Sequence, residues 1–210
     1  MTERQIFAFL KSQGLSDAGA AGAMGNMFAE SGLNSRNLQN SYEKKLGYTD
    51  ASYTKAVDNG SYRNFAFDKA GYGLCQWTYS TRKAALFAFA KTCGTSIGDA
   101  EMQLKFFMKE LREGYPAVLS VLKTSTMVRE ASDEVLLKFE RPADQSEAVR
   151  AKRAAYGQAY YNTLTGKETT MFTNSPLVSY TRISPNKTPN RNHAIDTVTI
   201  HCIVGQWTAK

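Results

Sequence analysis

One carboxylate near the N-terminus stands where it could act in acid catalysis. Glu30 follows a stretch, 18–25, in which every residue except Met24 is glycine or alanine, and it directly precedes Ser31 and Gly32. Ser16 is a favourable N-cap, and Gly32 suits the left-handed residue that ends many helices. The sequence therefore predicts a helix over 16–31 with Glu30 in its last turn.

The surroundings of Glu30 favour a proton on its carboxyl group. The negative end of the helix dipole, the apolar neighbours Met27 and Phe28, and partial burial all disfavour the charged form. A general acid near neutral pH needs such a setting. The alternative is an ordinary solvated glutamate at a helix end. Three glycines in this helix cost about 0.8–1 kcal/mol each relative to alanine, which indicates a close approach of another backbone.

A second group of candidates lies in the segment 70–78, Ala-Gly-Tyr-Gly-Leu-Cys-Gln-Trp-Thr. Its two glycines permit a close backbone approach or a positive φ. Tyr72 and Trp77 offer rings for the apolar face of a sugar, and Gln76 offers both a donor and an acceptor. The alternative is a buried turn in which Trp77 anchors the core.

The irregular stretch 32–70 holds the candidates for a second carboxylate. Glycosidases usually place two carboxyl groups across the bond that breaks. Asp68 lies nearest the 70–78 segment and is the candidate, whereas Asp58 stands in an Asp-Asn-Gly turn and is weaker. Aromatic and basic residues alternate in this stretch, which is typical either of sugar binding or of loops anchored to a core.

These motifs together resemble the phage tail lysozymes, which are peptidoglycan muramidases related in fold to goose-type lysozymes and lytic transglycosylases. The resemblance rests on Gly-Asn at 25–26, Ala-Glu-Ser-Gly at 29–32, and the Gly-Tyr-Gly-Leu and Gln-Trp of 71–77. The sequence Phe-Glu-Arg-Pro at 139–142 and the basic helix after it are also similar. The resemblance covers about residues 1–164.

The resemblance implies cleavage of the β-1,4 bond between N-acetylmuramic acid and N-acetylglucosamine. Glu30 would protonate the leaving oxygen, Asp68 is the candidate second carboxylate, and Tyr72, Gln76 and Trp77 would bind sugars. Either water or the muramoyl 6-hydroxyl completes the reaction, giving hydrolysis or transglycosylation. No cofactor is implied, and bacterial peptidoglycan is the expected partner.

A histidine near the C-terminus resembles the first zinc ligand of an N-acetylmuramoyl-L-alanine amidase. His201 lies within a β-rich run, 194–204. In that family a strand of the form Ile-x-Ile-His carries the first zinc ligand, and Val-Thr-Ile-His at 198–201 is similar to it. A catalytic zinc needs three protein ligands, and the remaining ones would lie beyond residue 210. The whole chain is then similar to a bifunctional phage endolysin with a truncated zinc amidase part.

The predicted fold class is mainly α: a lysozyme-like helical domain with a loop-rich insertion, plus a short β-containing C-terminal fragment. The domain covers 1–164, a polar linker 165–178, and the amidase-like fragment 179–210. Apolar periodicity predicts the remaining helices. Their expected ranges are 3–12, 81–92, 99–113, 117–123, 127–139 and 146–161.

Composition and charge limit the classes of protein to which this chain could belong. The 210 residues carry a net charge of +7, which suits an acidic polymer such as a bacterial wall, but no dense basic run favours nucleic acid. The three cysteines have no metal-type spacing, and their odd number argues against a disulfide framework. No signal peptide or membrane span is recognisable. We expect synthesis in the host cytoplasm and action on the wall, after holin-dependent release or from the virion.

Two other functions remain open from the sequence alone. One is a non-catalytic wall-binding or tail-tip module, in which the aromatic residues bind glycan and Glu30 has no chemical role. The other is a zinc amidase that uses residues 1–164 only for targeting. The oligomeric state does not follow from the sequence.

Overall fold

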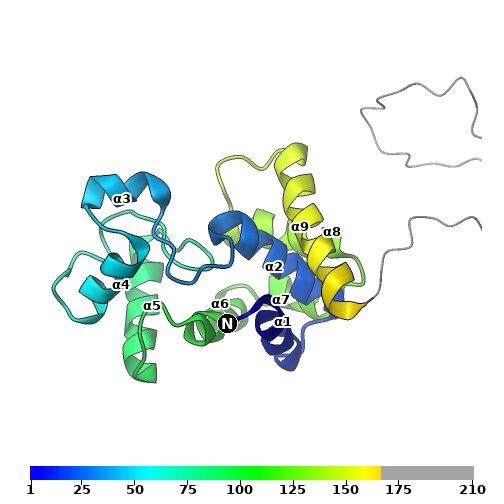
Figure 1. The fold of residues 1–210 in the computed structure, drawn as a ribbon. Helices are drawn as coiled ribbons and strands as arrows, with labels where there is room; N and C mark the ends of the chain where they lie inside the picture. Colours follow the sequence, from blue (N-terminus) through cyan, green and yellow to red (C-terminus); the bar gives the residue numbers. More distant parts are fainter. Residues whose placement is uncertain (167–210) are drawn as a thin grey trace, which may run out of the picture. The chain divides into compact units, whose positions relative to one another are not determined.

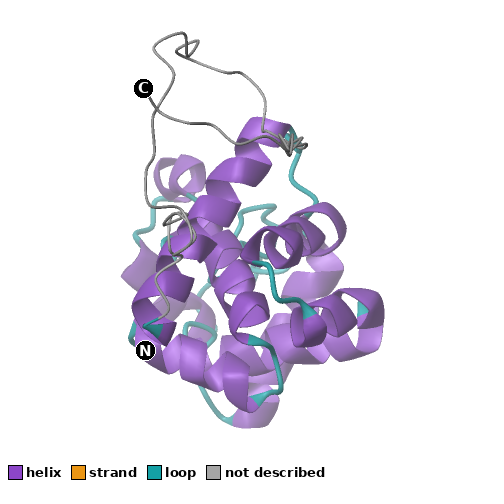
Figure 2. Ribbon diagram, turned by 90° about the vertical axis from the view of Figure 1, so that its right-hand side faces the viewer, coloured by secondary structure: helices purple, strands orange, loops and turns teal. Residues whose placement is uncertain are grey.

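The computed structural model describes residues 1–166, and these form helices joined by loops (Figures 1 and 2). The predicted linker, the amidase-like fragment and His201 lie outside the described residues. The helices are α1 (Glu3–Ser12), α2 (Asp17–Ser31), α3 (Asn40–Leu46), α4 (Asp50–Asp58), α5 (Ser80–Cys93), α6 (Ala100–Gly114), α7 (Pro116–Thr124), α8 (Val128–Glu134), the π-helical turn η1 (Val135–Glu140) and α9 (Glu147–Thr165).

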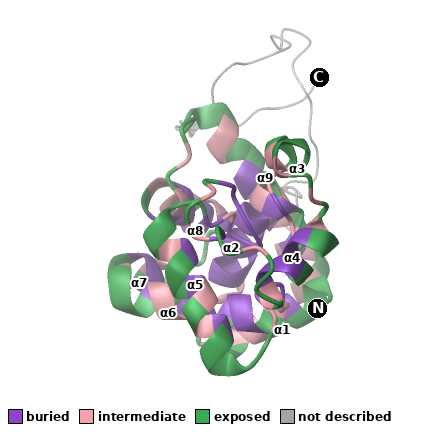
Figure 3. Ribbon diagram, turned by 90° about the vertical axis from the view of Figure 1, so that its left-hand side faces the viewer, coloured by how far each residue is buried: buried purple, intermediate pink, exposed green. Residues whose placement is uncertain are grey.

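Helix α2 is the centre of the fold and packs against α1, α7, α8 and α9 (Figure 1). Its N-cap is Ser16, whose side chain accepts a hydrogen bond from the Gly19 N–H. Gly32 ends it in the left-handed conformation with φ of 62°. Both predicted ends are therefore confirmed, and Figure 3 shows buried residues gathered around α2.

The small residues of α2 bring neighbouring backbones into contact with it. A Cβ atom added to Gly25 would lie 2.5 Å from both the Arg153 carbonyl oxygen and the Gly157 nitrogen on α9. One added to Gly22 would lie 2.8 Å from the Ser132 nitrogen on α8. The close approach predicted from the glycines is confirmed, and it explains why α2 tolerates their cost in helix propensity.

The mainly helical class and the predicted helices are confirmed, with two local differences. The stretch 32–70 contains α3 and α4. Apolar periodicity does not predict these helices, because both are short and α3 buries none of its residues. The predicted helix 127–139 divides into α8 and the π-helical turn η1. Among the described residues, no helix combines the length and apolar character that a bilayer crossing needs.

A buried ion pair fastens the 60–70 loop to α5. Lys83 Nζ lies 2.5 Å from Asp68 Oδ1, with exposed fractions of 0% and 1% for the two side chains. Asp68 also accepts hydrogen bonds from the hydroxyls of Tyr53 and Tyr62 and from the Ala70 N–H. Burial lowers the pKa of Lys83, and the Asp68 carboxylate opposes that shift. Asp68 is thus fully used in holding the loop.

We expect Gly25→Ala to destabilise the protein. The new methyl group meets α9 backbone atoms, and overpacking of this kind costs about 1–3 kcal/mol or more. Gly114→Ala is the matched control, because Gly114 also lies in a helix but a Cβ there meets no atom within 4 Å. Thermal unfolding should show a lower Tm for the first variant only. Equal Tm values would contradict the close packing.

We expect Asp68→Asn to lower the free energy of unfolding by about 3–5 kcal/mol, because it leaves the Lys83 ammonium buried without its counter-charge. The double variant Asp68→Asn, Lys83→Met removes the orphaned charge and should recover much of the loss. Urea titrations of both proteins measure this. A double variant no more stable than the single one would show that the ion pair is not the cause.

Candidate active site

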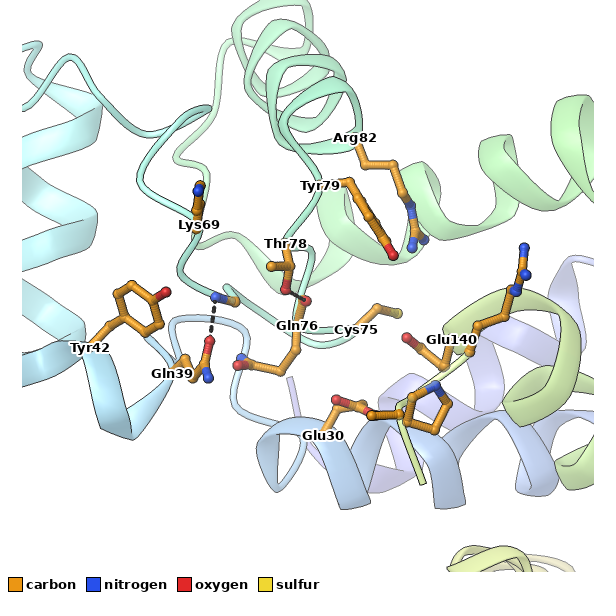
Figure 4. A pocket seen from close by; sticks show the side chains of 14 residues that line it. Glu30, Gln39, Tyr42, Lys69, Cys75, Gln76, Thr78, Tyr79, Arg82 and Glu140 are labelled. Carbon is orange, nitrogen blue, oxygen red and sulfur yellow. Dashed lines mark hydrogen bonds between the residues drawn. The ribbon is translucent and has the colours of Figure 1, made fainter. Parts of the chain in front are cut away.

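A pocket of about 630 Å³ opens beside the C-terminal end of α2 (Figure 4). Its walls come from that helix end, from the start of α3 with the residue before it, from the 69–82 segment, and from the end of η1 with the residues after it. The lining residues are Glu30, Gln39, Tyr42, Lys69, Gly71, Cys75, Gln76, Thr78, Tyr79, Arg82, Glu140, Arg141, Pro142 and Ala143. The two motifs that the sequence singled out therefore meet at one pocket.

Glu30 is held by a cation from α9. Its Oε1 lies 2.6 Å from Arg153 Nη1, and the exposed fractions are 19% for the Glu30 side chain and 10% for the Arg153 side chain. Arg153 Nη1 also donates to Asn26 Oδ1 at 3.3 Å, while Asn26 Nδ2 donates to the Ser132 carbonyl on α8. This chain of polar contacts fixes the Glu30 carboxyl relative to three helices.

A second carboxyl group faces the same pocket (Figure 4). Glu140 ends η1, and its Oε1 is buried without a hydrogen-bond partner among the described residues. Desolvation raises the pKa of Glu140 to about 8, the negative charge of Glu30 adds to the shift, and Arg82 and Arg153 oppose it. The desolvated surroundings of Glu140 therefore favour the protonated form of its carboxyl group.

The sequence alone assigns no role to Glu140. Its segment, 139–142, carries only the similarity to a family, although a carboxylate that ends an apolar helix two residues before a proline is a usable signal. Nothing in the chain spacing shows that residues 30 and 140 share a pocket, because the fold alone brings them together.

The 71–77 segment forms a tight turn against the end of α2. Tyr72 and Trp77 exchange backbone hydrogen bonds of 3.2 and 3.0 Å, and Ser31 Oγ donates to the Leu74 carbonyl oxygen. Gln76 reaches the pocket, and its Nε2 donates to the backbone and side-chain oxygens of Asn37. The residue after Glu30 is thus bonded directly to the second motif.

Tyr72 and Trp77 do not line the pocket. Both side chains have an exposed fraction of 0%. The Tyr72 hydroxyl lies 2.6 Å from Thr54 Oγ1, and Trp77 Nε1 donates to Glu110 Oε2 at 2.8 Å. In this structure neither ring is available to a sugar, so the expected stacking role is corrected to one of supporting the turn.

The two aspartates named from the sequence also lie away from the pocket lining. Asp68 is buried against Lys83, as described above. Asp58 accepts hydrogen bonds from Ser96 Oγ and the Ile97 N–H, at 2.5 and 2.9 Å, and so fixes the loop before α6. A catalytic role for Asp68 does not fit these contacts, because all of them use the carboxylate within the protein.

Strained backbone gathers at the pocket. Within residues 1–166, four non-glycine residues have a clearly positive φ, and three of them line it: Lys69 (64°), Gln76 (44°) and Arg141 (50°). Such conformations cost about 1–3 kcal/mol each and persist where the surroundings demand them, often at functional sites. This strain is an independent indication of function.

Arg82 and Cys75 complete the inner wall. Arg82 Nε lies 2.7 Å from Glu110 Oε1, and its guanidinium lies over the Phe139 ring at 4.5 Å. Burial raises the pKa of the Cys75 thiol well above its usual value, which disfavours the thiolate that a nucleophile needs. No cluster of three His, Cys, Asp or Glu residues suited to a metal occurs in the described part of the chain.

Comparison with known proteins places this arrangement in a family. No curated protein matches the chain. Residues 1–164 match the family described as phage tail lysozyme. The match covers the end of α2, the 71–77 turn and Glu140, and the amidase-like fragment falls outside it. The chain therefore belongs to the phage tail lysozyme family, with a peptidoglycan-degrading function of the lysozyme type.

Proposed function

We propose that the pocket cleaves the β-1,4 bond between N-acetylmuramic acid and N-acetylglucosamine by acid catalysis. The observation that carries the proposal is the pair of carboxyl groups, Glu30 and Glu140, in one open pocket with contrasting surroundings. Two titratable groups whose environments push their pKa values apart are typical of acid–base sites. Peptidoglycan glycan strands are the proposed substrate.

The two carboxyl groups have different roles: Glu30 is positioned to reach the sugar, and Glu140 carries the proton. Glu30 is held by Arg153 at the partly exposed helix end, where it can reach a bound sugar. Glu140 is desolvated and holds the proton of the pair at neutral pH. A glycan that fills the pocket excludes water, and a negative charge on Glu30 then becomes more costly. The proton held by the pair passes through Glu30 to the leaving glycosidic oxygen.

The second half of the reaction uses an oxygen nucleophile at the anomeric carbon. Water gives a new reducing muramic end, whereas the muramoyl 6-hydroxyl gives an anhydro end. In both cases the proton that the nucleophile loses returns to the Glu30–Glu140 pair, which has given its own proton to the leaving oxygen. Gln76 and the backbone around the 71–77 turn supply polar groups for the sugar hydroxyls and acetamido groups. No metal or organic cofactor enters this proposed chemistry.

Glu30→Gln should lower the rate of wall lysis by at least about a hundredfold, because the amide cannot transfer a carboxyl proton. The amide keeps an acceptor for Arg153, so the fold should survive. The measurement is the fall in turbidity of purified walls. Glu113→Gln, an exposed glutamate paired with Lys109 on α6, is the matched control. Lysis by Glu30→Gln at the parental rate would favour a non-catalytic wall-binding module.

Activity should fall as the pH rises through about 8, because Glu140 then loses the proton that the mechanism uses. Glu140→Gln stays neutral but has no acidic proton, so its residual activity should lack this decline. Initial rates on walls from pH 5 to 9 test the expectation. A parental rate that rises through pH 8 would mean that ionised Glu140 is the active form.

The same group should affect stability, with a sign that follows from linkage. The folded protein binds the Glu140 proton more tightly than the unfolded chain, so stability falls as the pH rises from about 4.5 to about 8. The difference in free energy of unfolding between parent and Glu140→Gln should therefore shift against the parent over that range. An unchanged difference would contradict the desolvated environment.

A further inference from the structure

Two aromatic rings beside the active-site pocket are unusually open to solvent. The exposed fractions are 69% for Phe67 and 72% for Tyr79. Water around an apolar ring is unfavourable, so exposed rings at a cleft are candidates for contact with a ligand. The catalytic proposal uses neither ring.

Both rings stand on fixed backbone. Phe67 lies between Phe65, which is 3% exposed, and the buried carboxylate of Asp68. Its N–H donates to the Asn64 carbonyl at 2.9 Å. Tyr79 precedes α5, and its carbonyl accepts a hydrogen bond from the Lys83 N–H at 2.9 Å. The backbone that carries each ring is therefore held by hydrogen bonds within the protein.

A second cavity of about 430 Å³ connects these rings with the active-site pocket. It is lined by Ala66, Phe67, Lys69, Thr78, Tyr79 and Ser80. Lys69, Thr78 and Tyr79 also line the first pocket. In Figure 4, Lys69, Thr78 and Tyr79 lie on the wall opposite Glu30. The two hollows are therefore parts of one cleft.

We propose that this second cavity is a glycan subsite that binds an N-acetylated amino-sugar unit of the strand whose scissile bond lies in the first pocket. The inference rests on the proposed function, since the continuous cleft supplies the occupant. A pyranose ring has apolar faces that lie on Phe67 and Tyr79, while its hydroxyls meet the hydroxyls of Thr78 and Ser80.

The charge at the junction of the two cavities suits the same strand. Lys69 places an ammonium group there. The Lys69 backbone has a φ of 64°, which few non-glycine residues adopt. Peptide stems on muramic acid carry carboxylates, which an ammonium group attracts. A strand long enough to reach beyond the scissile bond therefore meets both apolar and cationic groups in this direction.

Binding of peptidoglycan oligosaccharides of increasing length tests the subsite. The full chain with Glu30→Gln serves as the parent, so that binding is measured without turnover. Calorimetry gives Kd for a disaccharide and for an octasaccharide. Phe67→Ala in this background should weaken octasaccharide binding by about tenfold and disaccharide binding much less, because only the longer strand spans both cavities.

Two further variants control the interpretation. Phe67→Tyr keeps a ring and should restore the affinity for the octasaccharide. Met127→Ala removes another exposed apolar side chain, 61% exposed and outside the cleft, and should leave both Kd values at those of the parent. Thermal unfolding of each variant checks the fold.

The outcomes separate this inference from the catalytic proposal. Equal octasaccharide affinity for Phe67→Ala and Met127→Ala would overturn the subsite, whatever the fate of the glycosidic bond. Cleavage of the octasaccharide by the Glu30→Gln parent, seen by chromatography, would instead contradict the role of Glu30 and leave the comparison of affinities intact.

Discussion

The direct contact between the backbones of α2 and α9 determines the rest of the site. Gly25 and Gly157 have no side chains at the crossing, so Arg153 on α9 reaches Glu30 on α2. The same approach brings Asn26 between Arg153 and α8. A close-packed interior does not adjust to an added methyl group without cost, so the position of the Glu30 carboxyl depends on glycine at both positions.

The proposed chemistry rests on the contrasting environments of two carboxyl groups. Glu30 has a cation at hydrogen-bond distance, whereas Glu140 has a desolvated oxygen with no hydrogen-bond partner within residues 1–166. Desolvation and the negative charge of Glu30 both raise the pKa of Glu140. The 71–77 turn, bonded to Ser31, closes the pocket around them.

The sequence predicts the helices better than the site. Helices follow from local residue preferences, whereas the site depends on contacts between distant parts of the chain. The helix 16–31, its caps and its close neighbours follow from local propensity and residue size. Aromatic residues in a glycine-rich turn suit either a cleft or a core, so the sequence does not decide the role of Tyr72 and Trp77, whereas their burial does. Asp68 is a candidate because it lies near the 70–78 segment in the chain, yet its carboxylate pairs with Lys83. Local sequence assigns no role to Glu140, because Glu30 lies 110 residues earlier in the chain.

Mass spectrometry of purified peptidoglycan digested by the full chain tests the central claim most directly. The account predicts new ends on muramic acid, either reducing or anhydro, in amounts that grow with time. Glycan strands of unchanged length, with stem peptides released or with no product formed, would contradict glycosidic cleavage by the Glu30–Glu140 pair.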